Sequence, residues 1–462
     1  TVQAKAGALT SGADSNIVKV PMYETVFYTS TGEVTDINPA SVEWLYNNQF
    51  WLTIAPEEIA ITEFTFKDDG IDMEAMFYDN EWFFIKAPEF AGGDGTVENP
   101  YKVANAKQLN NVRYRLDACF EQIADIDLEA FLSGSVEGWE PIGFKNMPFT
   151  GSYDGKGKII SNLTINRPNQ GYIGLFGENR GTVSNVSLSE ADVTGQWFVG
   201  ALIGYNRAGN ITDCNMSGFV NGTSGSTGGL IGFSPDGGNI SGCYSDGSVS
   251  APSSHYVGGL IGGLYSGTLK ESYSTCNVTG GGYYVGGLLG SNYDSIVSKC
   301  FAMGSVTGVN AVGGLSGDNM YGGIIINCYA TGSVYGTEKV GGLVGDNYGT
   351  VNGSYAQIIT SYSNGYVVGD TETGGLVGRN ENGATVTHSF WDTDTSGQTA
   401  SAGGTGSTTR DMTTESGIMI YVDWDFTVTW VIKTDPSNPG GPAAYPSLLW
   451  QGEENIPYHY DV

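Results

Sequence analysis

The chain has 462 residues, of which 70 are glycine, 40% are hydrophobic and 12% are aromatic, a composition typical of a folded, turn-rich, all-β protein rather than of a disordered chain. Its formal net charge of −29 argues against nucleic acid as a partner, because affinity for phosphate backbones comes mainly from Lys and Arg. No apolar run approaches the ~20 residues that a membrane-spanning helix needs, so we expect no transmembrane segment.

The first two segments predict a small domain and a connection to the central part of the chain. Residues 1–91 alternate apolar and polar side chains, as in "TVFYTSTGEV" and "EFTFKDDGIDMEAMFYDNEWFFIKA", which predicts a small β-rich domain. The stretch "GGDGTVENP" then marks a boundary. Residues 92–139 are expected to lead into a series of repeats and to cap them with a short helix, for which residues 105–124 have the helix-like spacing.

Residues 140–400 consist of repeats. An apolar phrase such as "VGGLVG" recurs, and its leucines are separated by 27, 28, 30, 28, 27, 28 and 33 residues. These leucines are Leu175, Leu202, Leu230, Leu260, Leu288, Leu315, Leu343 and Leu376. Each copy holds short apolar stretches of strand length and too much glycine for a helix. The sequence therefore predicts a parallel β-helix or β-solenoid of about eight repeats of ~28 residues, in which each unit buries its apolar face against its neighbours.

An asparagine follows four residues after most of these leucines. The positions are Asn179, Asn206, Asn292, Asn319, Asn347 and Asn380, whereas Ser234 and Leu264 stand in the other two copies. Asparagine tolerates turn geometry, and stacked amides can hydrogen-bond along a ladder of rungs. We interpret this column as a structural turn ladder.

A cysteine column occupies a second equivalent position, at Cys214, Cys243, Cys300 and Cys328. Adjacent rungs of a parallel sheet are ~4.8 Å apart, within the Cα separation that a disulfide accepts. Cys214 with Cys243 and Cys300 with Cys328 are therefore candidate disulfides. A stack of reduced, buried thiols fits the same pattern and is the interpretation that we favour; Cys119 and Cys276 lie outside the column.

The residue after the cysteine position is aromatic in most copies. This column contains Tyr244, Tyr273, Phe301, Tyr329, Tyr362 and Phe390. If the rings point outward, they form a ribbon suited to stacking on sugars or to burial against another subunit. If the solenoid is covered at this place, they form a second core, and the sequence leaves both alternatives open.

The C-terminal residues 401–462 read as a loop-rich second cap. Just before them, "DTDTSG" places Asp392 and Asp394 as in the opening of a calcium loop. The twelfth position is Gly403 rather than a bidentate Glu, so a Ca²⁺ site is only weakly indicated and no other cofactor is expected.

Phrases such as "GGLVGDNYGTV" and "NCYATGSVYG" resemble the GLUG-motif repeats of secreted and cell-surface proteins of bacteria and archaea, including the non-catalytic part of some immunoglobulin A peptidases. The resemblance extends over roughly residues 92–415. It implies an extracellular scaffold with varied attachments, for which the surface layers or sheaths of some archaea are one setting.

The sequence offers little that indicates catalysis. Parallel β-helix enzymes that act on polysaccharides need clustered carboxylates, or calcium with a basic residue, on one exposed face. Asp318 and Asp346 share a column, but other copies carry Glu178, Tyr205, Ser291 and Arg379 there, a variation that we interpret as that of a turn.

We therefore expect a non-enzymatic extracellular protein that assembles with itself into an envelope layer, sheath or fibre. A surface adhesin or glycan-binding module is the first alternative, and a polysaccharide-active β-helix enzyme is the second.

Overall fold

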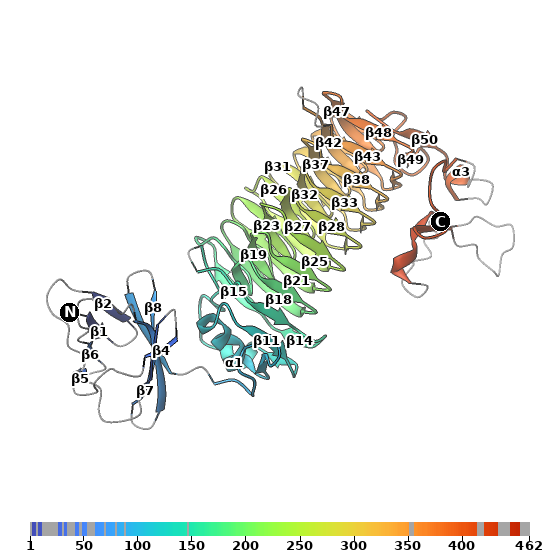
Figure 1. Ribbon diagram of the computed structural model, residues 1–462. Helices are drawn as coiled ribbons and strands as arrows, with labels where there is room; N and C mark the ends of the chain where they lie inside the picture. Colours follow the sequence, from blue (N-terminus) through green and yellow to red (C-terminus); the bar gives the residue numbers. More distant parts are fainter. Residues whose placement is uncertain are drawn as a thin grey trace. The chain divides into compact units, whose positions relative to one another are not determined.

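The computed structural model describes residues 89–145, 147–350, 355–413, 420–432 and 444–452, and, before residue 89, the backbone of nine strands. The chain divides into two compact units, Thr1–Phe90 and Ala91–Val462 (Figure 1).

The first unit contains one antiparallel sheet, which we name sheet 1. Its strand order is β4-β3-β7-β8-β9-β2-β1-β6-β5. The strands are β1 (Val2–Lys5), β2 (Ala8–Ser11), β3 (Val26–Thr29), β4 (Gly32–Val34), β5 (Val42–Leu45), β6 (Gln49–Leu52), β7 (Ile61–Asp68), β8 (Ile71–Tyr78) and β9 (Glu81–Lys86). The three longest, β7, β8 and β9, form a meander of consecutive hairpins.

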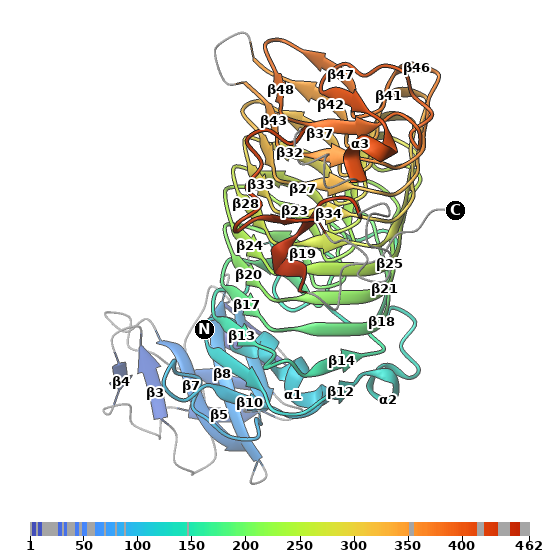
Figure 2. The same cartoon turned by 90° about the vertical axis from the view of Figure 1, so that its right-hand side faces the viewer.

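The second unit is a parallel β-solenoid, which confirms the predicted fold class. Its rungs stack so that equivalent strands of successive rungs pair in parallel (Figures 1 and 2). Two long sheets run along it. Sheet 2 contains β10 (Tyr101–Val103), β11 (Cys119–Gln122), β13 (Ser152–Asp154), β17 (Thr182–Ser184), β20 (Asn210–Thr212), β24 (Asn239–Ser241), β28 (Thr268–Lys270), β33 (Ile296–Ser298), β38 (Ile324–Ile326), β43 (Gln357–Ile359) and β48 (Thr385–Thr387). Sheet 3 contains β12 (Ile126–Asp127), β14 (Ile159–Ser161), β15 (Thr164–Arg167), β18 (Ser187–Gly195), β21 (Asn215–Gly222), β25 (Tyr244–Ala251), β29 (Tyr273–Ser274), β30 (Asn277–Gly280), β34 (Phe301–Ala302), β35 (Val306–Thr307), β39 (Tyr329–Ala330), β40 (Val334–Tyr335), β44 (Tyr362–Ser363), β45 (Val367–Val368), β49 (Phe390–Asp392) and β50 (Thr405–Ser407).

Two shorter sheets complete each rung. Sheet 4 contains β16 (Phe176–Asn179), β19 (Ile203–Asn206), β23 (Ile231–Ser234), β27 (Ile261–Tyr265), β32 (Leu289–Tyr293), β37 (Ser316–Met320), β42 (Val344–Tyr348) and β47 (Val377–Glu381). Sheet 5 contains β22 (Ser226–Gly228), β26 (Tyr256–Gly258), β31 (Tyr283–Gly286), β36 (Asn310–Gly313), β41 (Glu338–Gly341) and β46 (Thr371–Gly374). The eight strands of sheet 4 match the eight copies of the apolar phrase.

The recurring leucines form the centre of the core. Each of the eight, from Leu175 to Leu376, is fully buried. The glycines before them let the rungs approach closely: a Cβ added to Gly314 would lie 2.1 Å from the carbonyl oxygen of Gly342 in the next rung. The "GGL" phrase therefore combines a buried leucine with backbone positions where the next rung leaves no room for a side chain.

The helix-like spacing over residues 105–124 corresponds to a helix only in its first part. Helix α1 (Ala106–Asn111) begins after Asn105, whose Oδ1 accepts a hydrogen bond from the Gln108 N–H at 3.0 Å, and a 3₁₀ turn (Val112–Tyr114) follows. Strand β11 then pairs with β10 and β13. Pairing within sheet 2 thus overrides the local helical spacing. The other helices of the described residues are short: α2 (Glu129–Leu132), α3 (Thr409–Thr413) and a 3₁₀ turn (Leu449–Gln451).

The described residues after α3 pack along the side of the solenoid. After α3, residues 420–432 and 444–452 lie against sheet 3 (Figure 2). Their strands β51 (Trp430–Val431) and β52 (Ser447–Leu448) pair antiparallel. We name these residues the C-terminal strap. In the described part of the chain, none of the helices is long and apolar enough to cross a membrane.

Candidate functional site

The asparagine column forms two hydrogen-bonded ladders inside the solenoid. In the first, the Asn179 Nδ2 donates to Asn206 Oδ1 at 2.8 Å, and the Asn206 Nδ2 donates to Ser234 Oγ at 3.2 Å. In the second, Asn292 donates to Asn319 at 2.6 Å, Asn319 to Asn347 at 2.8 Å and Asn347 to Asn380 at 2.7 Å. These amides lie at the ends of sheet 4 strands, and all but the last are fully buried.

Leu264 separates the two ladders. It occupies the asparagine position in the rung before Asn292, where it is fully buried. The buried Oδ1 of Asn292 has no hydrogen-bond partner within the described residues, because the neighbouring rung offers a leucine instead of an amide. An unsatisfied acceptor is therefore built into the middle of the column.

The cysteine column consists of buried free thiols. Cys214, Cys243, Cys300 and Cys328 are fully buried, and all six cysteines of the chain are unpaired. Each of the four thiols donates to the carbonyl oxygen two residues before it, at 3.2–3.3 Å, as Cys214 does to Thr212. Serines make the same bond where they replace cysteine, as Ser272 does to Lys270 at 2.8 Å.

Burial also determines the chemistry of these thiols. It raises the pKa of Cys214 and of Cys300 well above the ordinary value, with the neighbouring thiol adding to the effect. A thiolate nucleophile is therefore strongly disfavoured at Cys214 and Cys300.

The predicted aromatic column stacks in register along sheet 3. Its neighbouring rings are nearly parallel. The centroids of Tyr273 and Phe301 are 4.7 Å apart and their planes are inclined by 3°, and the centroids of Tyr329 and Tyr362 are 5.1 Å apart and their planes are inclined by 8°. Tyr244 and Tyr273 are half-buried, whereas the other four rings are 7% exposed or less.

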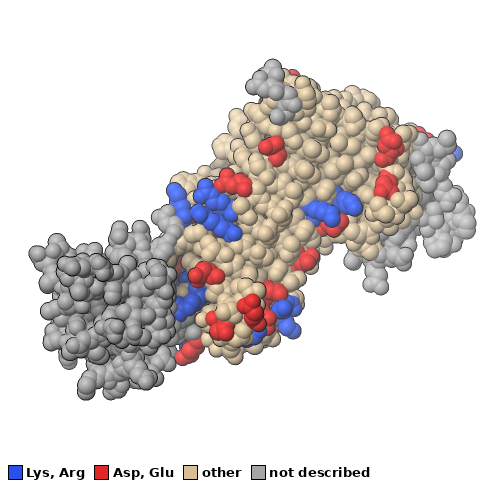
Figure 3. Space-filling view, in the orientation of Figure 1, with Lys and Arg blue, Asp and Glu red and all other residues tan. Residues whose placement is uncertain are grey.

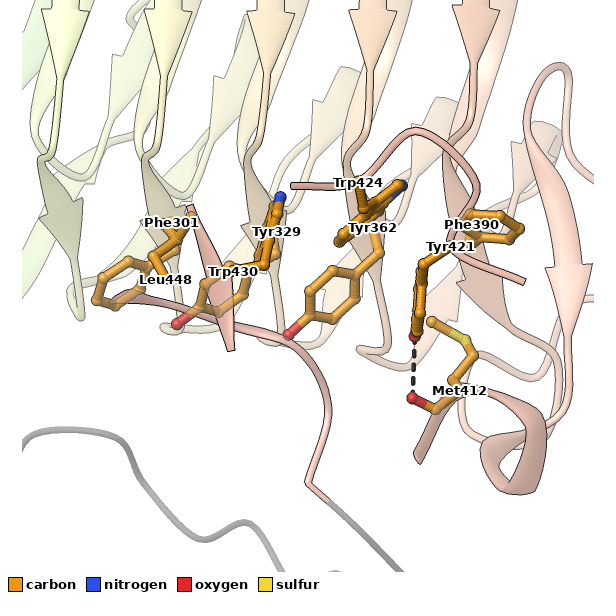
Figure 4. Packing of buried hydrophobic residues seen from close by; sticks show 9 residues of the cluster. All are labelled: Phe301, Tyr329, Tyr362, Phe390, Met412, Tyr421, Trp424, Trp430 and Leu448. Atoms are coloured by element: carbon orange, nitrogen blue, oxygen red, sulfur yellow. Dashed lines mark hydrogen bonds between the residues drawn. The ribbon is translucent and has the colours of Figure 1, made fainter. Parts of the chain in front are cut away.

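The C-terminal strap covers those four rings. Figure 4 shows Tyr421, Trp424, Trp430 and Leu448 of the strap against Phe301, Tyr329, Tyr362 and Phe390. The Tyr362 hydroxyl donates to the Pro446 carbonyl at 2.8 Å, and the Trp430 Nε1 donates to Asn327 Oδ1 at 3.1 Å. Over these rungs the column is a second core and not an open ribbon.

Asp392 and Asp394 accept hydrogen bonds from neighbouring groups of the chain. Asp392 is fully buried and accepts hydrogen bonds from the backbone N–H groups of Asp394 and Thr395 and from the hydroxyls of Thr409 and Tyr445. Asp394 accepts from the Thr409 N–H. The described residues contain no group of three or more His, Cys, Asp or Glu that could hold a metal ion.

A second row of aromatic rings, which the repeat pattern did not predict, runs along the outer face of sheets 4 and 5. Each ring contacts the next, with centroids 4.7–6.3 Å apart. We name this set the outer aromatic row: Tyr172, Phe198, Tyr205, Phe233, Tyr265, Tyr293, Tyr321 and Tyr348. These rings are partly exposed, and no described segment of the chain is packed over them as the strap is over sheet 3.

Two buried carboxylates lie on the same sheet. Asp318 and Asp346 belong to β37 and β42 and are 1% exposed, so the interpretation of their column as a turn is wrong. Asp346 forms ion pairs with Arg379 at 2.5 Å and with Lys339 at 3.8 Å. Asp318 accepts from the Ser291 hydroxyl at 2.8 Å and from the Asn292 N–H at 3.1 Å.

Among the described residues, none forms an ion pair with Asp318. Burial raises its pKa well above the ordinary value, and the charge of Asp346 acts in the same direction, while the two hydrogen bonds oppose them. The carboxyl group therefore holds its proton more strongly in the folded chain than in the unfolded one.

These features define a β-solenoid scaffold with one covered and one open aromatic surface. The family model described as "The GLUG motif" matches residues 281–307 and 308–335, so the chain contains GLUG-motif repeats, as the resemblance implied.

Two curated relatives match parts of the chain. A protein of Evansella cellulosilytica, provisionally named a Gly-rich membrane protein, is 46% identical over 125 residues, 25% of this chain and 14% of its own length. Halomucin of Haloquadratum walsbyi is 32% identical over 191 residues, 39% of this chain and 2% of its own length. The chain thus spans only a small part of either relative.

Two solved structures are also similar. A Bacteroides ovatus protein, provisionally described as an immunoglobulin A1 protease, has a TM-score of 0.43 and 20% identity, covering 78% of this chain and 95% of that one. A structure named IgA1 Protease has a TM-score of 0.42 and 15% identity, covering 82% of this chain and 29% of that one.

Proposed function

We propose that this chain is a non-enzymatic structural protein of the cell exterior and that its solenoid joins end to end with further copies. The observation that carries the proposal concerns the C-terminal end of the solenoid. Sheets 2, 4 and 5 finish there with β48, β47 and β46, and no further strand pairs with them in the described part of the chain. Unpaired edge strands are templates for pairing with another chain.

The core at this end is covered, whereas the edge of sheet 2 is open. The Gly375 N–H donates to the Ala400 carbonyl at 3.0 Å, and the Ala402 N–H donates to the Val377 carbonyl at 3.0 Å. This crossing segment closes the apolar interior above Leu376 without adding a strand to β48. A joining copy would therefore add backbone hydrogen bonds rather than fill an exposed core.

The interactions of the buried carboxylates support a structural role, because each carboxylate binds groups of the chain itself. Asp392 holds a loop, Asp346 is paired with Arg379, and Asp318 bonds to Ser291 and to a backbone N–H. The setting outside the cell is supported by the GLUG repeats and by the provisional name of the Evansella relative, which describes a membrane protein.

The test uses a proline at the open edge. The Thr385 N–H and the Thr387 carbonyl both bond toward β43, so the N–H of Val386 between them points to the open side, because backbone groups alternate along a strand. Val386→Pro removes this donor and leaves the existing bonds in place, whereas Val386→Ala shortens the side chain and keeps the donor.

The full chain and both variants would be compared by analytical ultracentrifugation over a concentration series and by electron microscopy. We expect the unmodified chain and Val386→Ala to form end-to-end assemblies, and Val386→Pro to sediment mainly as a monomer. A chain that stays monomeric at all concentrations, or a proline variant that assembles as well as the alanine variant, would overturn the proposal.

A further inference from the structure

We propose that the N-terminal end of the outer aromatic row, together with Trp197, binds an uncharged polysaccharide. The four rings concerned come from successive rungs of the solenoid and are Tyr172, Phe198, Tyr205 and Phe233. Trp197 directly precedes Phe198, and its carbonyl accepts a hydrogen bond from the Tyr172 N–H at 2.8 Å. This surface is separate from the edge strands β46–β48, so the inference goes beyond the proposed assembly.

Trp197 is placed as an open platform. Its side chain is 50% exposed. The equivalent corners of the rungs on either side carry Gly171 and Gly225, and a Cβ on these glycines would lie 3.2 Å from the Trp197 Cβ and 3.1 Å from its Cδ1. Any larger residue there would press on the tryptophan, so the two glycines leave the indole uncovered along the solenoid.

The neighbouring rings also leave faces open. Tyr172 and Phe198 meet at 70°, and Phe198 and Tyr205 meet at 65°, with centroids 5.3 and 4.9 Å apart. In an edge-to-face contact, the ring that presents its edge keeps both of its faces free of the partner, whereas the partner has one face covered. Further along the row, Tyr265 and Tyr293 are stacked at 22°, and their faces cover each other. Phe198 and Phe233 at the N-terminal end are also stacked, at 26°. The exposed Trp197 indole, rather than the ring angles alone, therefore directs binding to this end.

The electrostatics favour an uncharged partner. The nearby cations are already paired: Arg167 with Glu137 at 2.8 Å, Arg180 with Glu178 at 2.8 Å, and Arg207 with Asp236 at 2.9 Å. The chain as a whole carries a formal charge of −29, which repels anionic polymers. On the face that Figure 3 shows, charged side chains form small clusters within a mostly uncharged surface.

A neutral sugar chain meets these conditions. The C–H face of a pyranose is weakly positive and stacks on the negative face of an aromatic ring, while its hydroxyls need neutral hydrogen-bonding groups. Gln196 and Gln170 lie close to Trp197 in the chain, and their backbones are joined by a 2.7 Å hydrogen bond between adjacent rungs. The Gln170 Oε1 already accepts from Arg167 at 3.1 Å, so the Gln170 Nε2 and the Gln196 amide are the neutral groups that would meet the sugar hydroxyls. A lipid surface would not use these amides, and a nucleic acid would need free cations.

The experiment measures binding of the full chain to a soluble β-glucan, an α-mannan and a galactan by affinity electrophoresis, followed by calorimetry on any polymer that retards the protein. We expect at least one of the three to bind, and Trp197→Ala to weaken that binding about tenfold or more, the scale of a lost aromatic anchor. Because the indole is half exposed, the melting temperature should change little.

Phe219→Ala is the matched control. Phe219 is a 64% exposed ring on sheet 3, outside the outer aromatic row, so its removal should leave binding unchanged. Val386→Pro should also bind normally, which separates this inference from the assembly. Retardation by none of the three polymers, equal effects of Trp197→Ala and Phe219→Ala, or Trp197-dependent binding only to alginate or to phosphatidylcholine vesicles would overturn the proposal.

Discussion

The two aromatic rows of this solenoid arise in the same way, but one is buried and the other is partly exposed. Both arise because parallel rungs in register place equivalent side chains above one another. Along sheet 3 the rings from Phe301 to Phe390 are buried beneath the C-terminal strap, whereas along sheets 4 and 5 the rings from Tyr172 to Tyr348 stay partly exposed. The repeat thus determines that the rings stack, and the presence or absence of a covering segment determines how exposed they are.

The sheet 3 column contains this contrast within itself. Tyr244 and Tyr362 occupy equivalent positions, and each stacks on a neighbour at a similar distance, 4.9 Å for Tyr244 on Tyr273 and 5.1 Å for Tyr329 on Tyr362. Only Tyr362 lies beneath the strap, at 2% exposure. Comparing substitutions of these two tyrosines separates the contribution of the strap to stability from the contribution of ring stacking.

The largest effect is expected for Tyr362→Ala. The change leaves a cavity beneath Trp424 and Trp430 and removes the hydroxyl that bonds to Pro446, so the free energy of unfolding should fall by about 3–5 kcal/mol. Tyr244→Ala, which removes an uncovered ring, should cost about 1 kcal/mol. Denaturant unfolding and hydrogen exchange in residues 444–452 measure the two effects.

Tyr362→Phe serves as the control for this pair, because it removes the hydrogen bond and keeps the ring. We expect it to cost about 1 kcal/mol, the usual value for one such bond. Equal losses for Tyr244→Ala and Tyr362→Ala would show that the strap contributes nothing to the stability of the column.

The repeat could be predicted from the sequence because each buried leucine recurs at nearly constant spacing. The strap could not, because Trp430 and Tyr362 belong to segments with no shared period, and their contact is long-range packing without a local signal. The outer aromatic row was missed for a different reason. Its rings change position, three residues after the leucine in Tyr205 and Phe233 and five residues after it in Tyr265 and Tyr293, so no single column contains them.

The same contrast between covered and uncovered positions applies to the asparagine ladder. Asn319 is fully buried between Asn292 and Asn347, whereas Asn380 is the partly exposed end. Asn319→Ala leaves a donor of Asn292 and an acceptor of Asn347 without their partners and should cost about 2–3 kcal/mol.

Asn380→Ala should cost about 1 kcal/mol, since water can reach the end of the ladder. Thermal and denaturant unfolding of both variants checks the order. A loss at Asn380 as large as that at Asn319 would contradict the dependence on burial.

The last effect depends on pH and concerns the carboxyl group of Asp318, which is 1% exposed. Its pKa is raised by burial, so the protonated form stabilises the fold fully at pH values below the unfolded pKa near 3.8, and this stability is lost as the pH rises through the folded pKa. Asp318→Asn stays neutral throughout and can still accept from Ser291. We therefore expect the variant to gain stability relative to the unmodified chain as the pH rises from about 4 to 8, by about 1.4 kcal/mol for each unit by which the pKa is raised.

Ser291→Ala tests the opposite sign at the same site. The Ser291 hydroxyl donates to Asp318 and favours its charged form, so its loss should destabilise the fold more at pH 8 than at pH 4. Unfolding free energies of the three proteins across this range decide the matter. If the curves of both variants run parallel to that of the unmodified chain, the Asp318 carboxyl has the same pKa in the folded and the unfolded chain. Enough water would then reach the open face of sheet 4 to hydrate this charge, in contrast to the covered face of sheet 3.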